Sequence, residues 1–244
     1  MIAMLIRRDT LVDQAYEHLC DMIREMTPGA NKLPSEEALS EMLDVSRPTV
    51  RGALKRLEKD GYITTVHGIG TFGHPSMFRM KGRIDVNTDF YQLIKCQHKD
   101  IAVQNLHFGV QQSSREFCMH FNCSPQDVYR MLWTYTASGL PTIVCVYEFL
   151  LSIIREMPQE DDQYRDLDEF SRKCLYHRIT YCTMCLAAVQ NSAMAVRLGV
   201  QEDAALLSIE EMIYDIGDHP VGFANCYIHP SNMRLTMAAQ FGKP

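Results

Sequence analysis

The fold of the first part of this chain is set by residues Leu33–Phe72, LPSEEALSEMLDVSRPTVRGALKRLEKDGYITTVHGIGTF. This stretch predicts two short helices around a tight turn, followed by a hairpin with glycines at its tip. In the second helix Arg47, Arg51 and Lys55 recur every four residues, so they share one face, while apolar residues occupy another. A short helix with a basic front and an apolar back is shaped to enter the major groove of DNA.

Local signals set the ends of the predicted helices. Ser35 and Ser46 can cap two N-termini, and Pro48 is tolerated in a first turn because its missing N–H would be unpaired there. Gly61 is typical of a helix end. An apolar stripe predicts an earlier helix over residues 10–26, with Thr10 as its N-cap.

A two-stranded wing is predicted after these helices, with strands over residues 62–66 and 71–72. Gly68 and Gly70 let the tip turn tightly and approach a phosphate, and His67 can enter the minor groove. The alternative is an ordinary glycine hairpin with an exposed histidine.

The basic face predicts separate roles for its residues on DNA. Arg47, near the helix start, can bond a guanine edge, and Arg51 can reach a base or a phosphate. Thr49 offers a methyl and a hydroxyl, whereas Lys55 and Arg56 would hold the backbone without reading sequence. Alternatively, this stripe is only the solvated face of an exposed helix.

Three blocks in order carry a resemblance to a known family: LPSEEAL, DVSRPTVRGALKRLEKDGYI and HGIGTF. Together they resemble the winged helix-turn-helix of GntR-type bacterial transcription regulators, which implies a DNA-binding domain over residues 1–75. Where many family members have a DNA-contacting arginine, this chain has Glu37, which puts the operator sequence in doubt. The DNA-binding residues that we predict are Ser35, Ser46, Arg47, Pro48, Thr49, Arg51, Lys55, His67 and Gly68.

The rest of the chain reads as a linker over residues 76–100 and a second domain over residues 101–244. A capping-box pattern, Ser113 to Glu116, predicts a short helix. Tyr135–Pro141 and Tyr214–Pro220 share a Tyr-to-Pro interval of six, each between strand-like runs. This echo predicts two similar hairpins in one antiparallel sheet. Between them we predict helices over 166–176 and 192–198 and a strand over 179–189.

The second domain is similar to the UTRA effector-sensing domain of the HutC subfamily, through RLGVQEDAALLSIEEMIYD at Arg197–Asp215 and the two hairpins. The resemblance implies an α+β fold around a six-stranded antiparallel sheet, shared with chorismate lyase. It further implies a small-molecule pocket and a homodimer contact through this domain.

Effector residues are harder to assign. In sugar-phosphate-sensing relatives two arginines and a glutamate bind the ligand, whereas Trp133, Tyr135 and Cys145 stand at the matching positions here. These departures argue against a phosphosugar. The nearest polar candidates are Arg130, Tyr135, Glu148, Arg178 and Tyr227, for each of which a structural role is an alternative.

Composition excludes several classes of protein. The net charge of −6 means that DNA binding must rest on a local basic face. No apolar run approaches the ~20 residues of a membrane span, and the N-terminus does not resemble a signal peptide, so we expect a cytoplasmic protein.

The nine cysteines are expected to be reduced thiols. Cys182 and Cys185 form a CxxC, but on a strand residues three apart face opposite ways, so we expect no metal or cofactor.

The sequence thus predicts a transcription regulator, a repressor that binds operator DNA as a homodimer and responds to a small-molecule metabolite. We find no nucleophile–base pair, phosphate loop or paired carboxylates, and so predict no catalytic residue. Two alternatives remain: a lyase-like enzyme with an accessory winged helix, and a thiol- or metal-responsive regulator.

Overall fold

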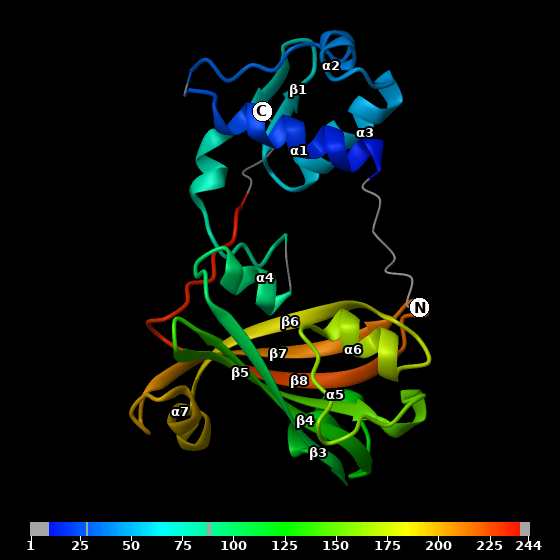
Figure 1. The fold of residues 1–244 in the computed structure, drawn as a ribbon, viewed down its shortest axis with the longest axis vertical. Helices are drawn as coiled ribbons and strands as arrows, with labels where there is room; N and C mark the ends of the chain where they lie inside the picture. The colour runs from blue at the N-terminus through cyan, green and yellow to red at the C-terminus, as the bar shows by residue number, and fades with distance from the viewer. Residues whose placement is uncertain (1–9, 28, 87–88, 240–244) are drawn as a thin grey trace. The chain divides into compact units, whose positions relative to one another are not determined.

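The computed structural model describes residues 10–27, 29–86 and 89–239, and the chain divides into two compact units. One unit comprises residues 1–86 and 236–244, and the other comprises residues 87–235. Figure 1 shows the elements in chain order: α1 Leu11–Arg24, α2 Glu36–Leu43, α3 Arg47–Lys59, β1 Ile63–Val66, β2 Gly70–Gly73, η1 Pro75–Arg79, α4 Phe90–Lys95, β3 Ile101–Gln112, α5 Arg115–Phe121, β4 Asp127–Ala137, β5 Leu140–Leu150, η2 Leu151–Ile153, α6 Leu167–Cys174, β6 Ile179–Gln190, α7 Ser192–Leu198, β7 Ala205–Asp215 and β8 Pro220–Ile228. In the described ranges, no helix has the length and apolar character needed to cross a bilayer.

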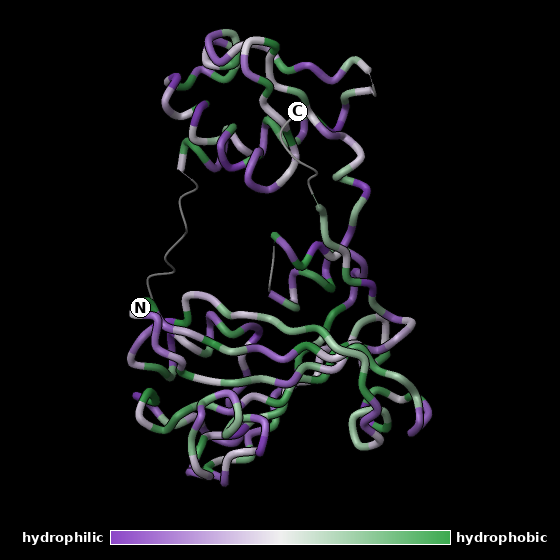
Figure 2. The backbone as a smooth tube through the Cα atoms, turned by 180° about the vertical axis from the view of Figure 1, so that it is seen from behind, coloured by the Kyte–Doolittle hydropathy of each residue, from purple (hydrophilic) through white to green (hydrophobic). Residues whose placement is uncertain are grey.

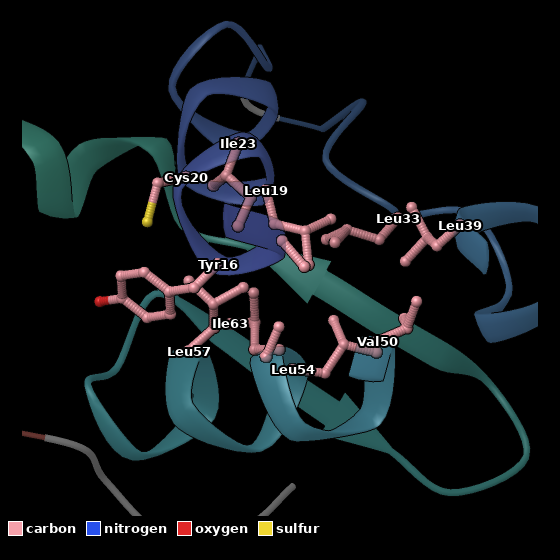
Figure 3. Close-up of a cluster of buried hydrophobic side chains, with 12 residues drawn as sticks. Tyr16, Leu19, Cys20, Ile23, Leu33, Leu39, Val50, Leu54, Leu57 and Ile63 are labelled. Atoms are coloured by element: carbon pink, nitrogen blue, oxygen red, sulfur yellow. The ribbon is translucent and has the colours of Figure 1, made fainter. Parts of the chain in front are cut away.

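The first unit is the predicted winged helix-turn-helix. Its three helices and the β1–β2 hairpin enclose one apolar core, which Figure 3 shows between α1, α3 and the wing. Leu19, Ile23, Leu39, Val50 and Leu57 are fully buried in it. The apolar back of α3 therefore packs inward and leaves its basic front outside, as the spacing predicts.

Side-chain caps fix where the helices start. Thr10 and Asp13 form a reciprocal capping box at α1, in which the Asp13 backbone N–H donates to Thr10 Oγ1 over 3.2 Å. Ser35 caps α2 and Ser46 caps α3 through their hydroxyl oxygens. These bonds satisfy backbone donors that would otherwise be orphaned, so the predicted starts are confirmed.

The limits of the first unit differ from the predicted boundary at residue 75. The segment over residues 81–84 pairs with Thr236: Ile84 N–H donates to Thr236 O over 3.0 Å, and Thr236 N–H donates to Gly82 O over 2.9 Å. The segment that starts at Thr236 thus belongs to the first unit. Helix α4 lies within the predicted linker over residues 76–100, but it belongs to the second unit. No local pattern encodes a pairing across more than 150 residues, which explains the difference.

The second unit is built on a six-stranded antiparallel sheet with the strand order β3-β4-β5-β8-β7-β6. Both predicted hairpins are confirmed, as β4–β5 and β7–β8, and the two lie side by side because β5 pairs with β8. The predicted helices at α6 and α7 and the predicted strand at β6 are also present. The α+β fold with a six-stranded antiparallel sheet is therefore confirmed.

Alternation along the strands gives the sheet two faces, and hydropathy changes from residue to residue along its strands in Figure 2. One face packs against α5 and α7 through Phe117 and Leu198. The other, which we call the aromatic face, carries the large side chains Tyr129, Trp133, Tyr135, Tyr147 and Phe149, all buried. On this side Phe90 of α4 packs edge-on against Tyr135, and Phe170 of α6 packs against Phe149.

The cap of α5 lies one residue later than the capping-box pattern predicts. Ser114, not Ser113, is the N-cap and accepts a hydrogen bond from Phe117 N–H over 3.0 Å. The backbone N–H of Ser114 donates to Glu148 of β5 over 2.9 Å. In a capping box the side chain of Glu116 would accept the hydrogen bond from the N-cap backbone, and here the carboxylate of Glu148 accepts it instead. A tertiary contact has replaced the local one.

Candidate functional site

The basic front of α3 lies on the surface of the first unit. Arg47, Arg51 and Lys55 are all exposed, and the side chains of the two arginines keep 56% and 57% of their accessible surface. Pro48 is exposed beside them, and Thr49 is half-buried. The helix therefore presents its cations outward, at the spacing needed to follow a groove.

Both arginines form ion pairs with glutamates at the start of α2. Arg47 Nη2 contacts Glu37, and Arg51 holds Glu36 through Nη2 and Nε, with the shorter contact at 2.7 Å. The hydrogen bond from Arg51 lowers the pKa of Glu36 below its usual value. Exposed pairs of this kind contribute only ~0–1 kcal/mol, so a DNA phosphate or base edge can displace the glutamates.

Arg56 occupies a different position from the one that the sequence suggests. Its Nη1 bonds Asp13 over 2.7 Å, and its guanidinium lies 4.2 Å from the centroid of the Tyr16 ring. One residue turns a helix by ~100°, which aims Arg56 at α1 while Lys55 stays on the open front. Arg56 is thus held against α1, and Lys55 remains the candidate backbone contact.

The caps also position the start of α3. Ser46 Oγ accepts from Thr49 N–H over 3.3 Å, and the two hydroxyls lie 2.8 Å apart. This bond orients the first turn, where Arg47 and Pro48 project. Ser35 holds the first turn of α2 in the same way, through Ala38 N–H at 3.2 Å. Ser35, Ser46, Arg47 and Pro48 are exposed at these two helix starts, and Thr49 is half-buried.

The wing places His67 and Gly68 at its exposed tip. Gly68 has φ +75° and Gly70 φ +136°, backbone that side chains rarely adopt, so glycine is required at the turn. Glu58 of α3 accepts from Thr65 N–H over 3.2 Å and ties the wing to the reading helix. Helix and wing tip are therefore joined within one unit.

Sequence reasoning missed one cation beside the wing. Lys32 forms an isolated bridge with Phe72, and its side chain crosses Gly70 so closely that a Cβ there would lie 2.6 Å from Lys32 Cε. The exposed Lys32 thus adds positive charge next to the glycine tip. The only local signal was a lysine just before Leu33, and the contact itself arises from the fold.

The five predicted effector residues do not gather at one place. Arg130 and Glu148 pair across β4 and β5 at 2.5 Å on the face covered by α5 and α7, where Glu148 also caps α5. Tyr227 is on the same face and accepts from Asn191 over 3.3 Å. Arg178 pairs with Asp168 at an exposed site, and Tyr135 lies on the aromatic face. Four of them thus have structural partners, because alternation along the strands separates residues that look adjacent in sequence.

The three positions that depart from the phosphosugar pattern do share a face. Trp133 and Tyr135 of β4 and Cys145 of β5 all lie buried on the aromatic face, with Trp133 directly opposite Cys145. Tyr164 stacks on Trp133 at 6.5 Å between ring centroids. None of these four residues is an arginine or a lysine, although Lys173 Nζ lies 5.4 Å from the centroid of the Tyr164 ring.

A buried carboxyl on the aromatic face escaped sequence reasoning. Glu211 of β7 keeps only 2% of its accessible surface, and burial raises its pKa to about 8. Among the described residues it has no hydrogen-bonding or ion-pair partner. The only signal in the sequence is that two glutamates, Glu210 and Glu211, follow one another in β7. Because side chains alternate along a strand, only one of them can face outward, and that residue is Glu210.

The CxxC cysteines lie on β6, as predicted. Cys182 faces the aromatic side opposite Ile213, and Cys185 is exposed and opposite Glu210. They therefore project from opposite faces of the strand, which does not suit a shared metal ion.

Comparison with known proteins agrees with both halves of this description. A family model described as "Bacterial regulatory proteins, gntR family" matches residues 11–72, and a model described as "UTRA domain" matches residues 97–234. Over 66 residues the chain is 38% identical to the fatty acid metabolism regulator protein of Edwardsiella ictaluri (strain 93-146). The matched region covers 27% of this chain and 28% of that protein. The match thus spans less than a third of the length of such curated relatives.

Solved structures share the fold at low sequence identity. The candidate transcriptional regulator YydK of Bacillus subtilis superposes with a TM-score of 0.74 at 20% identity, covering 95% of this chain and 100% of that one. The ligand-binding domain of a proposed GntR-family regulator from Bordetella bronchiseptica covers 59% of this chain and 93% of its own, with a TM-score of 0.52 and 15% identity.

The UTRA match alone covers more than half of the chain, and the gntR match coincides with the winged helix that presents the basic front of α3. The chain therefore belongs to the GntR family of DNA-binding transcription regulators, with a UTRA effector domain as its second unit.

Proposed function

We propose that this protein is a cytoplasmic repressor of the HutC type, which binds a palindromic operator as a homodimer and is modulated by a small-molecule effector in its UTRA domain. The observation that carries the DNA-binding part is the exposed row of Arg47, Arg51 and Lys55 on α3. In this proposal Arg47 and Arg51 read bases, and the tip of the wing, with Lys32 beside it, follows the adjacent backbone.

The proposed regulation is a coupling free energy between DNA and effector. If the two ligands favour different dimer geometries, each weakens the binding of the other by the same factor. A coupling of about 1–3 kcal/mol gives roughly 5–150-fold release from the operator. We assign no catalytic residue, because the polar groups described above are engaged in caps and ion pairs or buried in the sheet.

Lys55 tests the assignment of backbone contacts. Lys55→Ala should weaken binding to all DNA sequences by a similar factor, because a lysine on a phosphate carries no sequence information. The slope of log affinity against log salt should fall by about 0.9, the contribution of one phosphate contact. Fluorescence-anisotropy titrations of operator and scrambled duplexes at several salt concentrations measure both quantities.

Lys99→Ala provides the matched control, because Lys99 is an exposed lysine of the second unit. It should leave both affinity and salt slope unchanged. A selective loss of operator binding in Lys55→Ala, with scrambled DNA unaffected, would contradict the backbone role.

The homodimer proposal rests on an exposed apolar edge of the sheet. β3 is an edge strand, and Leu106, Phe108 and Val110 keep 39%, 40% and 49% of their accessible surface. Leu106 lies opposite Leu132 and Val110 opposite Tyr129, so the exposed apolar side chains line this edge strand from both faces of the sheet. Exposed apolar groups along an unpaired edge mark an interaction surface. We propose that the second copy of this chain covers it, as a two-fold operator requires.

Sedimentation without DNA tests the dimer. The chain of 28.0 kDa should sediment at about twice its mass, and Phe108→Asp should shift it toward the monomer because a charge would enter the contact. Leu140→Asp, at the exposed β4–β5 turn, should leave the mass unchanged. A strict monomer at micromolar concentration for the unmodified chain contradicts the proposal.

A further inference from the structure

Two polar groups face each other across the centre of the aromatic face. In the sheet register Tyr147 of β5 lies opposite Ala224 of β8, which lies opposite Glu211 of β7. The two polar residues thus flank one intervening strand, with their Cα atoms about 10 Å apart at a strand spacing of ~4.8 Å. Because Ala224 is small, both longer side chains rise above it from either side.

Neither polar group has a nitrogen or oxygen partner within the described chain. Tyr147 Oη is fully buried with only the thiols of Cys145 and Cys226 beside it, and the side chain of Glu211, which keeps 2% of its accessible surface, has no hydrogen bond or ion pair. Native proteins rarely bury a carboxyl and a hydroxyl unpaired, because removing either from water without a hydrogen bond is unfavourable. Two orphaned groups on one row indicate that their partner is a ligand.

The surroundings define the charge of that ligand. Trp133 and Tyr135 supply aromatic rings around this row, with the Trp133 ring centroid 5.3 Å from that of Tyr147, and ring faces attract cations. The strand residues of this row include one carboxyl and no arginine or lysine. An anion would therefore find no counter-charge there, whereas a cation would find both a carboxylate and π-faces.

We propose that Glu211 and Tyr147 form the polar end of the effector site and that this site takes a small organic ammonium ion enclosed by the aromatic face. This proposal rests on the proposed function and names the class of its effector. Glu211 supplies the counter-charge, Tyr147 offers a hydroxyl to a polar substituent, and the rings of Trp133 and Tyr135 contact the alkyl groups on nitrogen.

A pH dependence follows from the burial of Glu211. Its pKa of about 8 means that the carboxyl holds a proton at neutral pH and must release it to pair with a cation. The groups that face it are Tyr135, Tyr147, Cys145, Cys182 and Cys226, and burial raises the pKa of each, so they stay neutral up to pH 8. Affinity for the cation should therefore rise with pH below 8, by up to about tenfold per pH unit.

Calorimetric titration of the full chain tests the site with three cations: choline, tetramethylammonium and benzylammonium. At pH 8 at least one should bind saturably, and the uncharged carbon analogue, in which a tert-butyl group replaces the trimethylammonium group of choline, should not. Glu211→Gln should weaken cation binding roughly 10–100-fold, the range for a hydrogen-bonded buried charge. Tyr147→Phe should weaken choline, which has a hydroxyl, more than tetramethylammonium.

Glu210→Gln is the matched control, because Glu210 adjoins Glu211 but points to the opposite face, where it contacts His120 at 3.2 Å. It should bind the cations as the unmodified chain does. Absence of binding by all three cations, equal binding of the neutral analogue, or full binding by Glu211→Gln would overturn the proposal. Operator binding without ligand is measured separately: its absence refutes the proposed function alone, and absence of cation binding with intact operator binding refutes the cation site alone.

Discussion

Replacing Glu211 by glutamine should stabilise the second unit at alkaline pH by about 5 kcal/mol while changing little at pH 4.5. The folded-state pKa of about 8 lies far above the usual 4.5, so the folded chain keeps a proton that the unfolded chain releases. The contribution of Glu211 to stability is therefore greatest below pH 4.5, falls as pH rises from there to 8, and is level above 8. Each unit of pKa difference is worth about 1.4 kcal/mol, which gives the magnitude.

Urea unfolding at pH 5, 6.5 and 8.5 measures this effect, and the single tryptophan makes the readout local. Trp133 lies in the core of the second unit on the same face as Glu211, so its fluorescence reports unfolding of that unit. The pH slope should vanish in Glu211→Gln and persist in Glu210→Gln. If the unmodified chain and Glu211→Gln show parallel stability profiles over this range, the carboxyl is not buried in a neutral form.

The second large effect concerns DNA. Arg47→Ala should weaken operator binding by about 1–3 kcal/mol and relax the preference at one base pair, because a bidentate contact between arginine and guanine is lost. Glu37→Gln should act in the opposite direction, since it removes the carboxylate that pairs with Arg47 in the free protein. That gain should be small, because an exposed ion pair contributes at most ~1 kcal/mol.

Competition titrations against operators that carry single base changes measure both the affinity and the relaxed position. Arg24→Ala is the control, because Arg24 is an exposed arginine of the same unit that pairs with Asp21 on α1. It should leave both quantities unchanged. Unaltered operator affinity for Arg47→Ala at moderate salt would mean that α3 is not the reading helix.

Local sequence determined much of the first unit. Three features depend only on neighbours within a turn or two and could therefore be predicted from the sequence. They are the helix starts at Ser35 and Ser46, the glycine tip of the wing and the four-residue spacing of the cations. The two hairpins of the sheet were readable for the same reason. The return of Thr236 to the first unit and the contact of Lys32 with Gly70 were not, since both join distant segments.

In the second unit, the pairing register of the strands determines which polar side chains share a face of the sheet. One-residue alternation sends Arg130 and Glu148 to one face and Trp133 and Tyr147 to the other, so candidates chosen by polarity and proximity in sequence did not converge. Sequence by itself determined a basic reading helix and a wing, because those properties belong to single elements. Only the tertiary structure decided that two glutamates hold the reading arginines and that Glu211 lies buried without a partner, because charge pairing and desolvation depend on which elements pack together.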